Sequence, residues 1–196
     1  MDRVRELIKE IREYGINNEV PIMSEETIEV ISNIIKENNI KNILEVGTAI
    51  GYSTICFASL GIDNITSIER DKVRYSIALN NVNKSGLNNI NLICDDALNT
   101  NIDRKVDLVI IDAAKSQNMK FFNKYKENLN DKGIIIIDNL SFHGYVGKSS
   151  EIKSRNLRQM VRKIEKFLDF LNNQTEYEVK YIEVGDTLGV CKKKNS

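Results

Sequence analysis

The stretch Ile43-Leu44-Glu45-Val46-Gly47-Thr48-Ala49-Ile50-Gly51-Tyr52-Ser53 decides the fold of this chain. Its first four residues predict a short, mainly apolar strand. The two glycines then bracket a tight turn, and helical spacing resumes from Tyr52 to Leu60. Glycines let the backbone turn sharply and keep Cβ atoms away from an approaching ligand. Because a helix N-terminus follows at once, backbone N–H groups are also presented there, and the stretch predicts a ligand-binding turn.

Two better-known glycine motifs do not match this turn. The dinucleotide fingerprint needs a third glycine or alanine where this chain has Tyr52, and a P-loop needs a Gly-Lys-Ser/Thr sequence that does not follow. The pattern that remains, Glu-x-Gly-x-Ala-x-Gly, resembles motif I of class I S-adenosylmethionine-dependent methyltransferases, with Ala49 in place of the middle glycine. The alternative is an ordinary strand-turn-helix unit of an α/β protein.

The composition indicates one domain, residues 1–196, whose residues 1–40 form an N-terminal helical cap segment. Lys plus Arg and Asp plus Glu both number 28, so any affinity for nucleic acid must come from a local patch. Three cysteines in apolar surroundings indicate buried, reduced thiols in a cytoplasmic protein. We expect no signal peptide and no membrane segment, because no long apolar span is present.

Apolar runs alternate with helical patterns along the chain, which predicts right-handed crossovers and a parallel sheet covered on both faces. Together with the motif I resemblance, this implies an α/β, Rossmann-like class I methyltransferase fold. We expect a mostly parallel seven-stranded sheet with a C-terminal antiparallel hairpin formed by residues 178–184 and 187–191. The other predicted strands span residues 43–46, 65–69, 91–94, 106–111 and 133–137, and predicted helices include 2–14, 52–60, 72–83, 119–129 and 152–171. A further helix is expected to begin after Ser24, a good N-cap.

Polar residues stand at the end of each predicted parallel strand, which is where ligands of open α/β sheets bind. Glu69 could accept hydrogen bonds from both hydroxyls of a ribose, or it could be a surface acid that starts a helix. Asp96 and Ala97 would lie beside an adenine. Ser53 could cap its own helix or bind the carboxylate of the ligand.

Asp112, Asp138 and Asn139 form a more specific set, because they indicate a metal site. Two carboxylates and an amide oxygen are hard ligands that match Mg²⁺ and not zinc. Three protein oxygens would leave three octahedral positions for water and substrate. Lys115 follows Asp112 by three residues and would place an amine near the metal. The alternative is that these are capping residues of two loops.

Across essentially its whole length the chain resembles the metal-dependent O-methyltransferases of the catechol O-methyltransferase type, and within them the bacterial tRNA 5-hydroxyuridine methyltransferases. The stretches that carry the resemblance are Pro21-Ile22-Met23, Glu45 to Ser53, Ile68-Glu69-Arg70, Ile111 to Lys115, Asp138-Asn139-Leu140 and Gly185-Asp186. Two departures are Ala49 and Asp95, each at a position where glycine is common in the family.

The resemblance implies S-adenosylmethionine as methyl donor and Mg²⁺, or another divalent cation, at the acceptor. It assigns the metal to Asp112, Asp138 and Asn139, and catalysis to Lys115 as base together with Asp112. It assigns the donor to Met23, Glu45, Gly47, Ser53, Glu69, Asp96, Ala97 and Asp112.

Two acceptors carry the adjacent oxygens that such a cation chelates: 5-hydroxyuridine at the tRNA wobble position, which would become 5-methoxyuridine, and a small catechol or phenol. Residues 148–166 hold seven basic and two acidic residues, a local net charge of +5 (7 − 2). Arg155, Arg158, Arg162 and Lys166 share one helical face, which could follow an RNA backbone or be the solvated side of an amphipathic helix. Phe142, His143 and Tyr145 could stack on either acceptor.

We therefore expect an O-methyltransferase that acts on the tRNA anticodon loop, with a small-molecule catechol enzyme as the alternative. A binding module that has lost catalysis is the third possibility, against which the intact Asp112, Lys115, Asp138 and Asn139 argue. A homodimer is expected from the resemblance, with the N-terminal helix and the closing hairpin as its supports.

Overall fold

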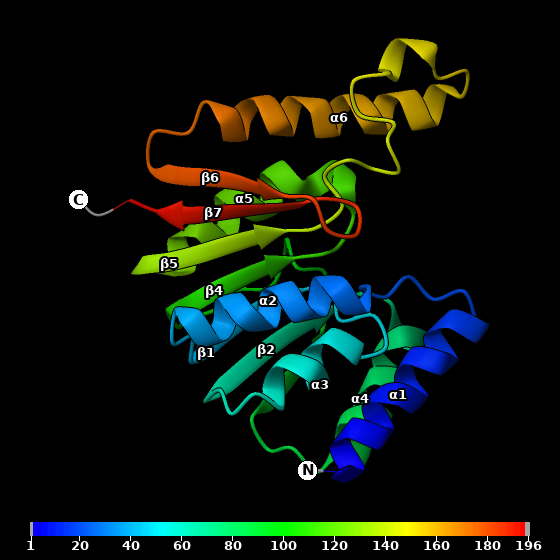
Figure 1. Cartoon of the computed structure of the whole chain (residues 1–196), viewed down its shortest axis with the longest axis vertical. Coiled ribbons are helices and arrows are strands. Elements are labelled where there is room, and N and C mark those ends of the chain that lie inside the picture. Colours follow the sequence, from blue (N-terminus) through cyan, green and yellow to red (C-terminus); the bar gives the residue numbers. More distant parts are fainter. Residues whose placement is uncertain (1, 195–196) are drawn as a thin grey trace. The chain divides into compact units, whose positions relative to one another are not determined.

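The computed structural model describes residues 2–194 and divides into two compact units, one that ends at Asp103 and one that begins at Arg104 (Figure 1). Each unit contains parallel strands with helices packed around them. The single domain predicted over residues 1–196 stays a prediction, and residues 1, 195 and 196 lie outside the described residues.

The first unit is built on three parallel strands in the order β3-β2-β1. These strands are β1 (Asn42–Val46), β2 (Asn64–Glu69) and β3 (Ile90–Cys94). The register pairs Val46 with Ile68 and Glu69 with Cys94, so the carboxyl ends of the three strands lie at one edge. The residues that follow these strands are therefore brought together, as the sequence predicts.

Among the described residues of the first unit, the helices are α1 (Asp2–Asn17), α2 (Glu25–Glu37), α3 (Tyr52–Ala58) and α4 (Lys72–Ser85). Ser24 caps α2 as predicted, because its hydroxyl accepts a hydrogen bond from the N–H of Thr27 at 3.1 Å. An apolar cluster that includes Leu7 of α1 and Ile55 of α3 joins these helices. Cys94 is exposed, contrary to expectation, because it ends β3, which lies at the end of the strand order.

In the second unit, the strands within residues 104–194 follow the order β4-β5-β7-β6. They are β4 (Val106–Ile111), β5 (Leu129–Ile137), β6 (Tyr177–Ile182) and β7 (Leu188–Lys193). β4 and β5 are parallel, whereas β7 pairs antiparallel with both β5 and β6, so the expected C-terminal antiparallel hairpin is confirmed. The unit also contains α5 (Asn118–Tyr125), α6 (Arg155–Asn172) and the short 3-10 helices η1 (Lys115–Gln117), η2 (Lys126–Asn128) and η3 (Ser149–Glu151).

The predicted helix over residues 119–129 is wrong at its C-terminal end. The α-helix ends at Tyr125, and Leu129 already belongs to β5, where it pairs with Val106. A register shift follows, because the next pair is Leu108 with Ile134. At this irregularity a Cβ on Gly133 would approach Leu129 Cδ2 to 2.8 Å, which explains why glycine stands there. Helical periodicity alone cannot reveal such a bulge.

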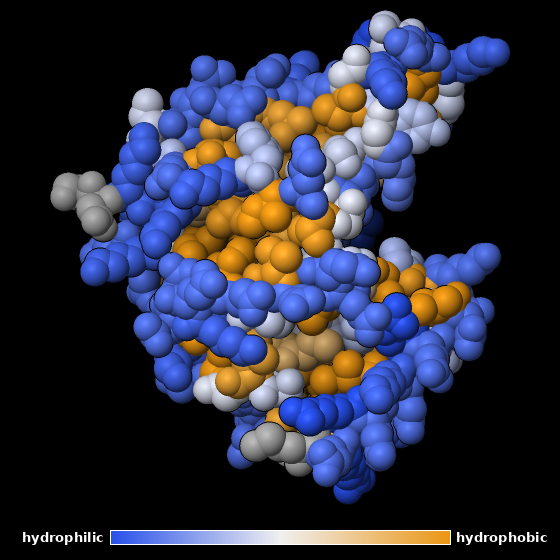
Figure 2. Space-filling model, viewed as in Figure 1, coloured by the Kyte–Doolittle hydropathy of each residue, from blue (hydrophilic) through white to orange (hydrophobic). Residues whose placement is uncertain are grey.

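The helix α6 is amphipathic, and at 18 residues it is the longest in the described chain. It begins at Arg155 and not at the predicted Ile152, because Ser154 caps it. Val161, Ile164, Phe167 and Leu171 are buried, and Figure 2 shows hydrophilic side chains along the outer side of the region where Figure 1 draws α6. Within residues 2–194, no helix combines the length and apolar character needed to cross a membrane.

Candidate active site

The glycine turn of the first unit is held against the end of β2. The N–H of Gly47 donates to the carbonyl of Ile68 at 3.0 Å, and the N–H of Ala49 donates to Glu69 Oε2 at 2.8 Å. Gly47 and Gly51 have φ angles of 107° and 85°, in the region that favours glycine. Ala49 also has a positive φ of 48°, so it adopts a backbone conformation that an alanine seldom takes. Its hydrogen bond to Glu69 holds it there.

Glu69 is an anchor of this turn and not a surface acid. Its side chain is 8% exposed, and Oε1 accepts a second hydrogen bond, from the N–H of Asp71 at 2.8 Å. The cap of α4 is Asp71, so the alternative in which Glu69 starts that helix is wrong. Each carboxylate oxygen has two lone pairs, so Glu69 retains acceptor capacity for a diol.

Glu45 lies beneath the turn and is fully buried. Its carboxylate accepts hydrogen bonds from the hydroxyls of Ser53 at 2.6 Å, Ser67 at 2.5 Å and Thr54. Ser53 therefore does not cap α3, whose N-cap is Gly51. Because its proton is directed at Glu45, Ser53 could contact a ligand only through its oxygen lone pairs or backbone N–H. Local sequence patterns do not reveal this network, since its hydroxyls come from two elements, α3 and β2.

Except for Asp112, which belongs to the second unit, the other residues predicted to bind the methyl donor also lie in the first unit. Asp96 follows β3 and its Oδ1 accepts from the N–H of Leu98 at 2.9 Å, while Ala97 is 7% exposed. Asp95 donates its backbone N–H to the carbonyl of Glu69 at 3.1 Å, which ties the loop after β3 to the end of β2. Met23 is buried in the segment before α2. Their contacts with a donor stay predictions.

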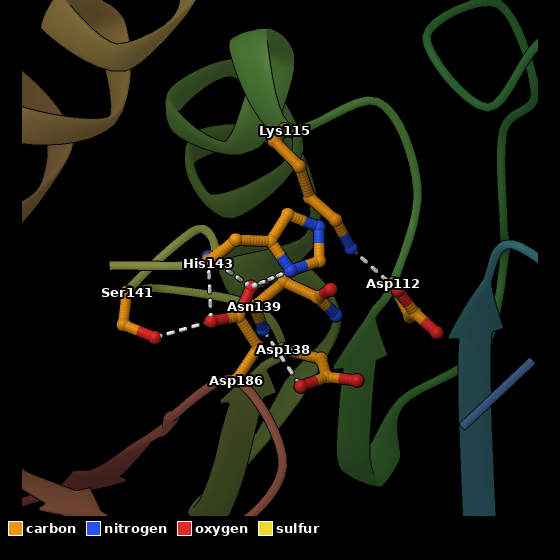
Figure 3. Close-up of polar contacts among 7 residues, drawn as sticks. All are labelled: Asp112, Lys115, Asp138, Asn139, Ser141, His143 and Asp186. Atoms are coloured by element: carbon orange, nitrogen blue, oxygen red, sulfur yellow. Dashed lines mark hydrogen bonds and ion pairs between the residues drawn. The ribbon is translucent and has the colours of Figure 1, made fainter. Parts of the chain in front are cut away.

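In the second unit, the carboxyl ends of β4 and β5 bring two acids together (Figure 3). Ile111 pairs with Ile137, and the N–H of Asp138 donates to the carbonyl of Ile111 at 3.1 Å. Asp112 and Asp138 therefore leave neighbouring strands side by side. Asn139 comes next, with a φ of 64°, and its N–H donates to Asp138 Oδ1 at 2.7 Å. The structure thus assembles all three residues of the predicted metal set.

Lys115 belongs to the same cluster. It begins η1, and its Nζ lies 2.5 Å from Asp112 Oδ1. Both side chains are mostly buried, with 15% and 21% of their surfaces exposed. The amine that the sequence placed near the acids is therefore in direct contact with one of them.

Asp138 is 4% exposed, and its surroundings disfavour a negative charge. Burial and the neighbouring charge of Asp112 raise the pKa of Asp138 to about 7, against a usual value of 3.8. Lys115 and the N–H of Asn139 act in the opposite direction, whereas Asp186 adds to the increase. A cation bound here would relieve this repulsion.

The donor set fits a divalent cation such as Mg²⁺, because it consists of hard oxygens. Among residues 2–194, no group of three or more His, Cys, Asp or Glu side chains is placed to hold a metal. A cation at Asp112 and Asp138 would therefore need the amide oxygen of Asn139 as its third protein ligand.

Local sequence patterns did not predict the roles of two residues next to this cluster, Ser141 and Asp186. Asp186, in the turn between β6 and β7, accepts hydrogen bonds from the hydroxyl of Ser141 and from the N–H of His143 (Figure 3). His143 Nδ1 lies 3.7 Å from Asp186 Oδ2. Gly185-Asp186 has the sequence of an ordinary hairpin turn, so nothing in it points to the loop after β5.

The predicted basic face of α6 is only partly available. Arg158 donates through Nε to the carbonyl of Ile152 at 2.9 Å and through Nη2 to the carbonyl of Lys153 at 3.3 Å. Its guanidinium therefore holds the segment before the helix. Arg155, Arg162 and Lys166 are exposed.

We predict that Glu69→Ala weakens donor binding about tenfold or more, since hydrogen bonds to a charged group contribute about 1.5–3 kcal/mol. The loss would combine the ribose contacts with the anchor of Ala49. Calorimetry with S-adenosylhomocysteine measures it. Asp71→Ala, which removes the exposed cap of α4, is the control. Unchanged donor affinity in Glu69→Ala would remove Glu69 from the site.

A second prediction concerns pH and the stability of chelator-treated protein. Because the pKa of Asp138 is raised in the folded state, its protonated form stabilises the fold at low pH. That contribution is lost as pH rises from about 4 through about 7. Asp138→Asn should therefore raise the melting temperature by several degrees at pH 8 and by less at pH 5. A lower melting temperature of the variant at pH 8 would contradict this environment for Asp138.

Comparison with known proteins gives the family. Residues 2–194 match the family model described as O-methyltransferase. The chain is 29% identical over 204 residues to the caffeoyl-CoA O-methyltransferase of Populus kitakamiensis, covering 96% of this chain and 86% of that protein. A crystal structure from Staphylococcus aureus, described provisionally as a caffeoyl-CoA O-methyltransferase, is 38% identical. It has a TM-score of 0.90 and covers 95% of this chain and 92% of that one.

The O-methyltransferase of Bacillus cereus, solved with S-adenosylhomocysteine, has a TM-score of 0.83 at 21% identity, over 96% of this chain and 91% of that one. These likenesses confirm the predicted fold class, a Rossmann-like methyltransferase fold with a mixed seven-stranded sheet. They also confirm the predicted class of enzyme. The chain therefore belongs to the O-methyltransferase family and is an S-adenosylmethionine-dependent O-methyltransferase.

Proposed function

We propose that this enzyme methylates a hydroxyl group that has a second oxygen beside it, with Mg²⁺ or another divalent cation at the acceptor. The observation that carries the proposal is the adjacency of Asp112, Asp138 and Asn139 at the ends of β4 and β5, with Lys115 in contact. Two carboxylates and an amide oxygen would hold the cation. When bound, it would supply Lewis-acid stabilisation of the acceptor oxygen.

The protein's own residues account for the remaining chemistry. The sulfonium of S-adenosylmethionine is already reactive, so the difficulty lies in removing the acceptor proton. Lys115 would take that proton on Nζ while the new O–C bond forms and the S–C bond breaks, leaving S-adenosylhomocysteine. In the structure this amine already lies among the acids, with Nζ 2.5 Å from Asp112 Oδ1. Donor binding would fall to Glu69 and the glycine turn of the first unit.

The first candidate acceptor is 5-hydroxyuridine at the tRNA wobble position, whose C5 hydroxyl and C4 carbonyl are adjacent oxygens. A wobble base is single-stranded and can be turned into a pocket. Exposed Arg155, Arg162 and Lys166 on α6 offer cations to an RNA backbone. Tyr145, 41% exposed in the loop after β5, offers a ring for stacking. The cytoplasmic location and the homodimer expected from the sequence belong to this proposal.

The second candidate is a small catechol. The names of the relatives favour it, because a caffeoyl group carries two neighbouring phenolic hydroxyls. Its two oxygens would engage the same cation, so the acidic cluster suits both acceptors equally. Only the surroundings of the cluster can distinguish the two.

Nucleoside mass spectrometry of tRNA from a deletion strain tests the acceptor directly. The tRNA proposal predicts loss of 5-methoxyuridine and accumulation of 5-hydroxyuridine. Unchanged 5-methoxyuridine, together with efficient methylation of free catechol by the purified enzyme, would establish the small-molecule alternative.

The α6 surface gives a further prediction. The double variant Arg155→Ala with Arg162→Ala should weaken tRNA binding. The slope of log K for tRNA binding against log salt concentration should also become less steep by about 1.5, as expected for two lost phosphate contacts. Lys120→Ala, an exposed lysine of α5, is the matched control. Binding titrations at several salt concentrations measure the slope. A double variant that binds and methylates tRNA like the wild type would remove α6 from the RNA surface.

A further inference from the structure

Asp186 makes contacts that exceed the needs of a hairpin turn. Its carboxylate accepts from the hydroxyl of Ser141, and both of its oxygens accept from the N–H of His143, at 2.8 and 2.9 Å. Only 17% of the side chain is exposed, although the residue lies in the turn between β6 and β7. One carboxylate therefore accepts hydrogen bonds from two residues of the loop that follows β5.

Backbone hydrogen bonds reinforce the same junction. The N–H of Leu140 donates to the carbonyl of Thr187 at 3.0 Å, and the N–H of Ser141 donates to the carbonyl of Asp186 at 3.1 Å. The loop is thus fixed to the β6–β7 turn from the first residue after Asn139. Asp186 and Asn139 are joined through this short run of residues.

The segment held in this way is strained. Asn139, Phe142 and His143 have φ angles of 64°, 46° and 54°, and Thr187 on the other side has 65°. Left-handed conformations of residues other than glycine persist where surrounding contacts enforce them, and they cluster at functional sites. Asp186 supplies those contacts at the end of β5. In Figure 3 the amide of Asn139 points toward the side where Asp112 and Asp138 lie.

We propose that Asp186 is a positioning residue for the cation site: by holding Ser141 and His143 it fixes the backbone at Asn139, and so directs the third protein ligand. This inference rests on the proposed function, because it assumes that Asn139 binds a cation. Residues that orient metal ligands typically change metal affinity 10–100-fold when removed. If Asp186 only anchored the hairpin, its removal would lower thermal stability and leave cation affinity unchanged.

The test measures Mn²⁺ affinity by electron paramagnetic resonance and S-adenosylhomocysteine affinity by calorimetry. Asp186→Ala is expected to weaken Mn²⁺ binding about tenfold or more and to leave S-adenosylhomocysteine binding unchanged. Asp186→Asn should restore Mn²⁺ binding, because its amide oxygen can still accept from Ser141 and His143. Glu183→Ala, an exposed acid beside the same turn, is the control for loss of charge.

Ser141→Ala keeps the test decisive if Asp186→Ala fails to fold, since it removes a single hydroxyl from the same contact and should weaken Mn²⁺ in the same direction. Wild-type Mn²⁺ affinity in Asp186→Ala or, where that variant does not fold, in Ser141→Ala would overturn the inference. So would an Asp186→Asn variant as impaired as Asp186→Ala. If the wild-type enzyme itself bound no Mn²⁺, the proposed function would fail first, which separates the two outcomes.

Discussion

Asp138→Ala is expected to reduce kcat by about 1,000-fold or more while donor affinity stays close to that of the wild type. Asp138 is the more buried of the two acids and stands beside the other two ligands of the proposed cation. Loss of metal-ion catalysis costs several kcal/mol of transition-state stabilisation, and each 1.36 kcal/mol is a factor of ten. Apart from Asp112, the residues proposed to bind the donor belong to the first unit, and Asp138→Ala leaves their contacts intact.

Initial rates and calorimetry with S-adenosylhomocysteine, run on the same preparation, measure the two quantities. Asp131→Ala, an exposed acid near the start of β5, is the control for loss of an aspartate from the segment that leads to Asp138. A variant that lost donor affinity but bound Mn²⁺ normally would contradict the assignment of Asp138 to the cation.

Lys115→Ala should lower kcat about 100- to 10,000-fold, the usual contribution of a positioned proton acceptor. Lys115→Arg separates the two roles that the amine could have. Arginine can keep an ion pair with Asp112, but it stays protonated and cannot act as a base. We therefore expect Lys115→Arg to be nearly as inactive as Lys115→Ala.

The pH dependence of kcat for the wild type and both variants completes this test. Wild-type kcat in Lys115→Arg would contradict a base role and reduce Lys115 to a charge that balances Asp112. Similar donor affinity in all three proteins would show that the effect lies in the acceptor half of the reaction.

Much of the fold follows from local sequence patterns. Strand ends, the glycine turn and the Ser24 cap were predictable because each depends on residues close together in the chain. The pairing of Asp112 with Asp138 was also predictable, since parallel strands place their carboxyl ends at one edge. The start of β5 was missed because the bulge before Gly133 interrupts the simple register.

The site residues that escaped prediction act through contacts that no short motif encodes. Ser141 and Asp186 are 45 residues apart, and although Gly185-Asp186 carries part of the family resemblance, nothing in that pair indicates a contact with Ser141. The hydroxyls that surround Glu45 come from α3 and β2, so only the packed structure reveals that Ser53 is engaged. Arg158 was predicted to contribute to an RNA-binding face, because periodicity places it on the basic side of α6. In the structure its guanidinium instead donates to the carbonyl of Ile152.

The most direct test of the central claim is anomalous diffraction from crystals grown with Mn²⁺ and S-adenosylhomocysteine. We predict a manganese ion bound by carboxylate oxygens of Asp112 and Asp138 and by the amide oxygen of Asn139. A manganese ion held by other residues, with those three side chains unligated, would contradict it.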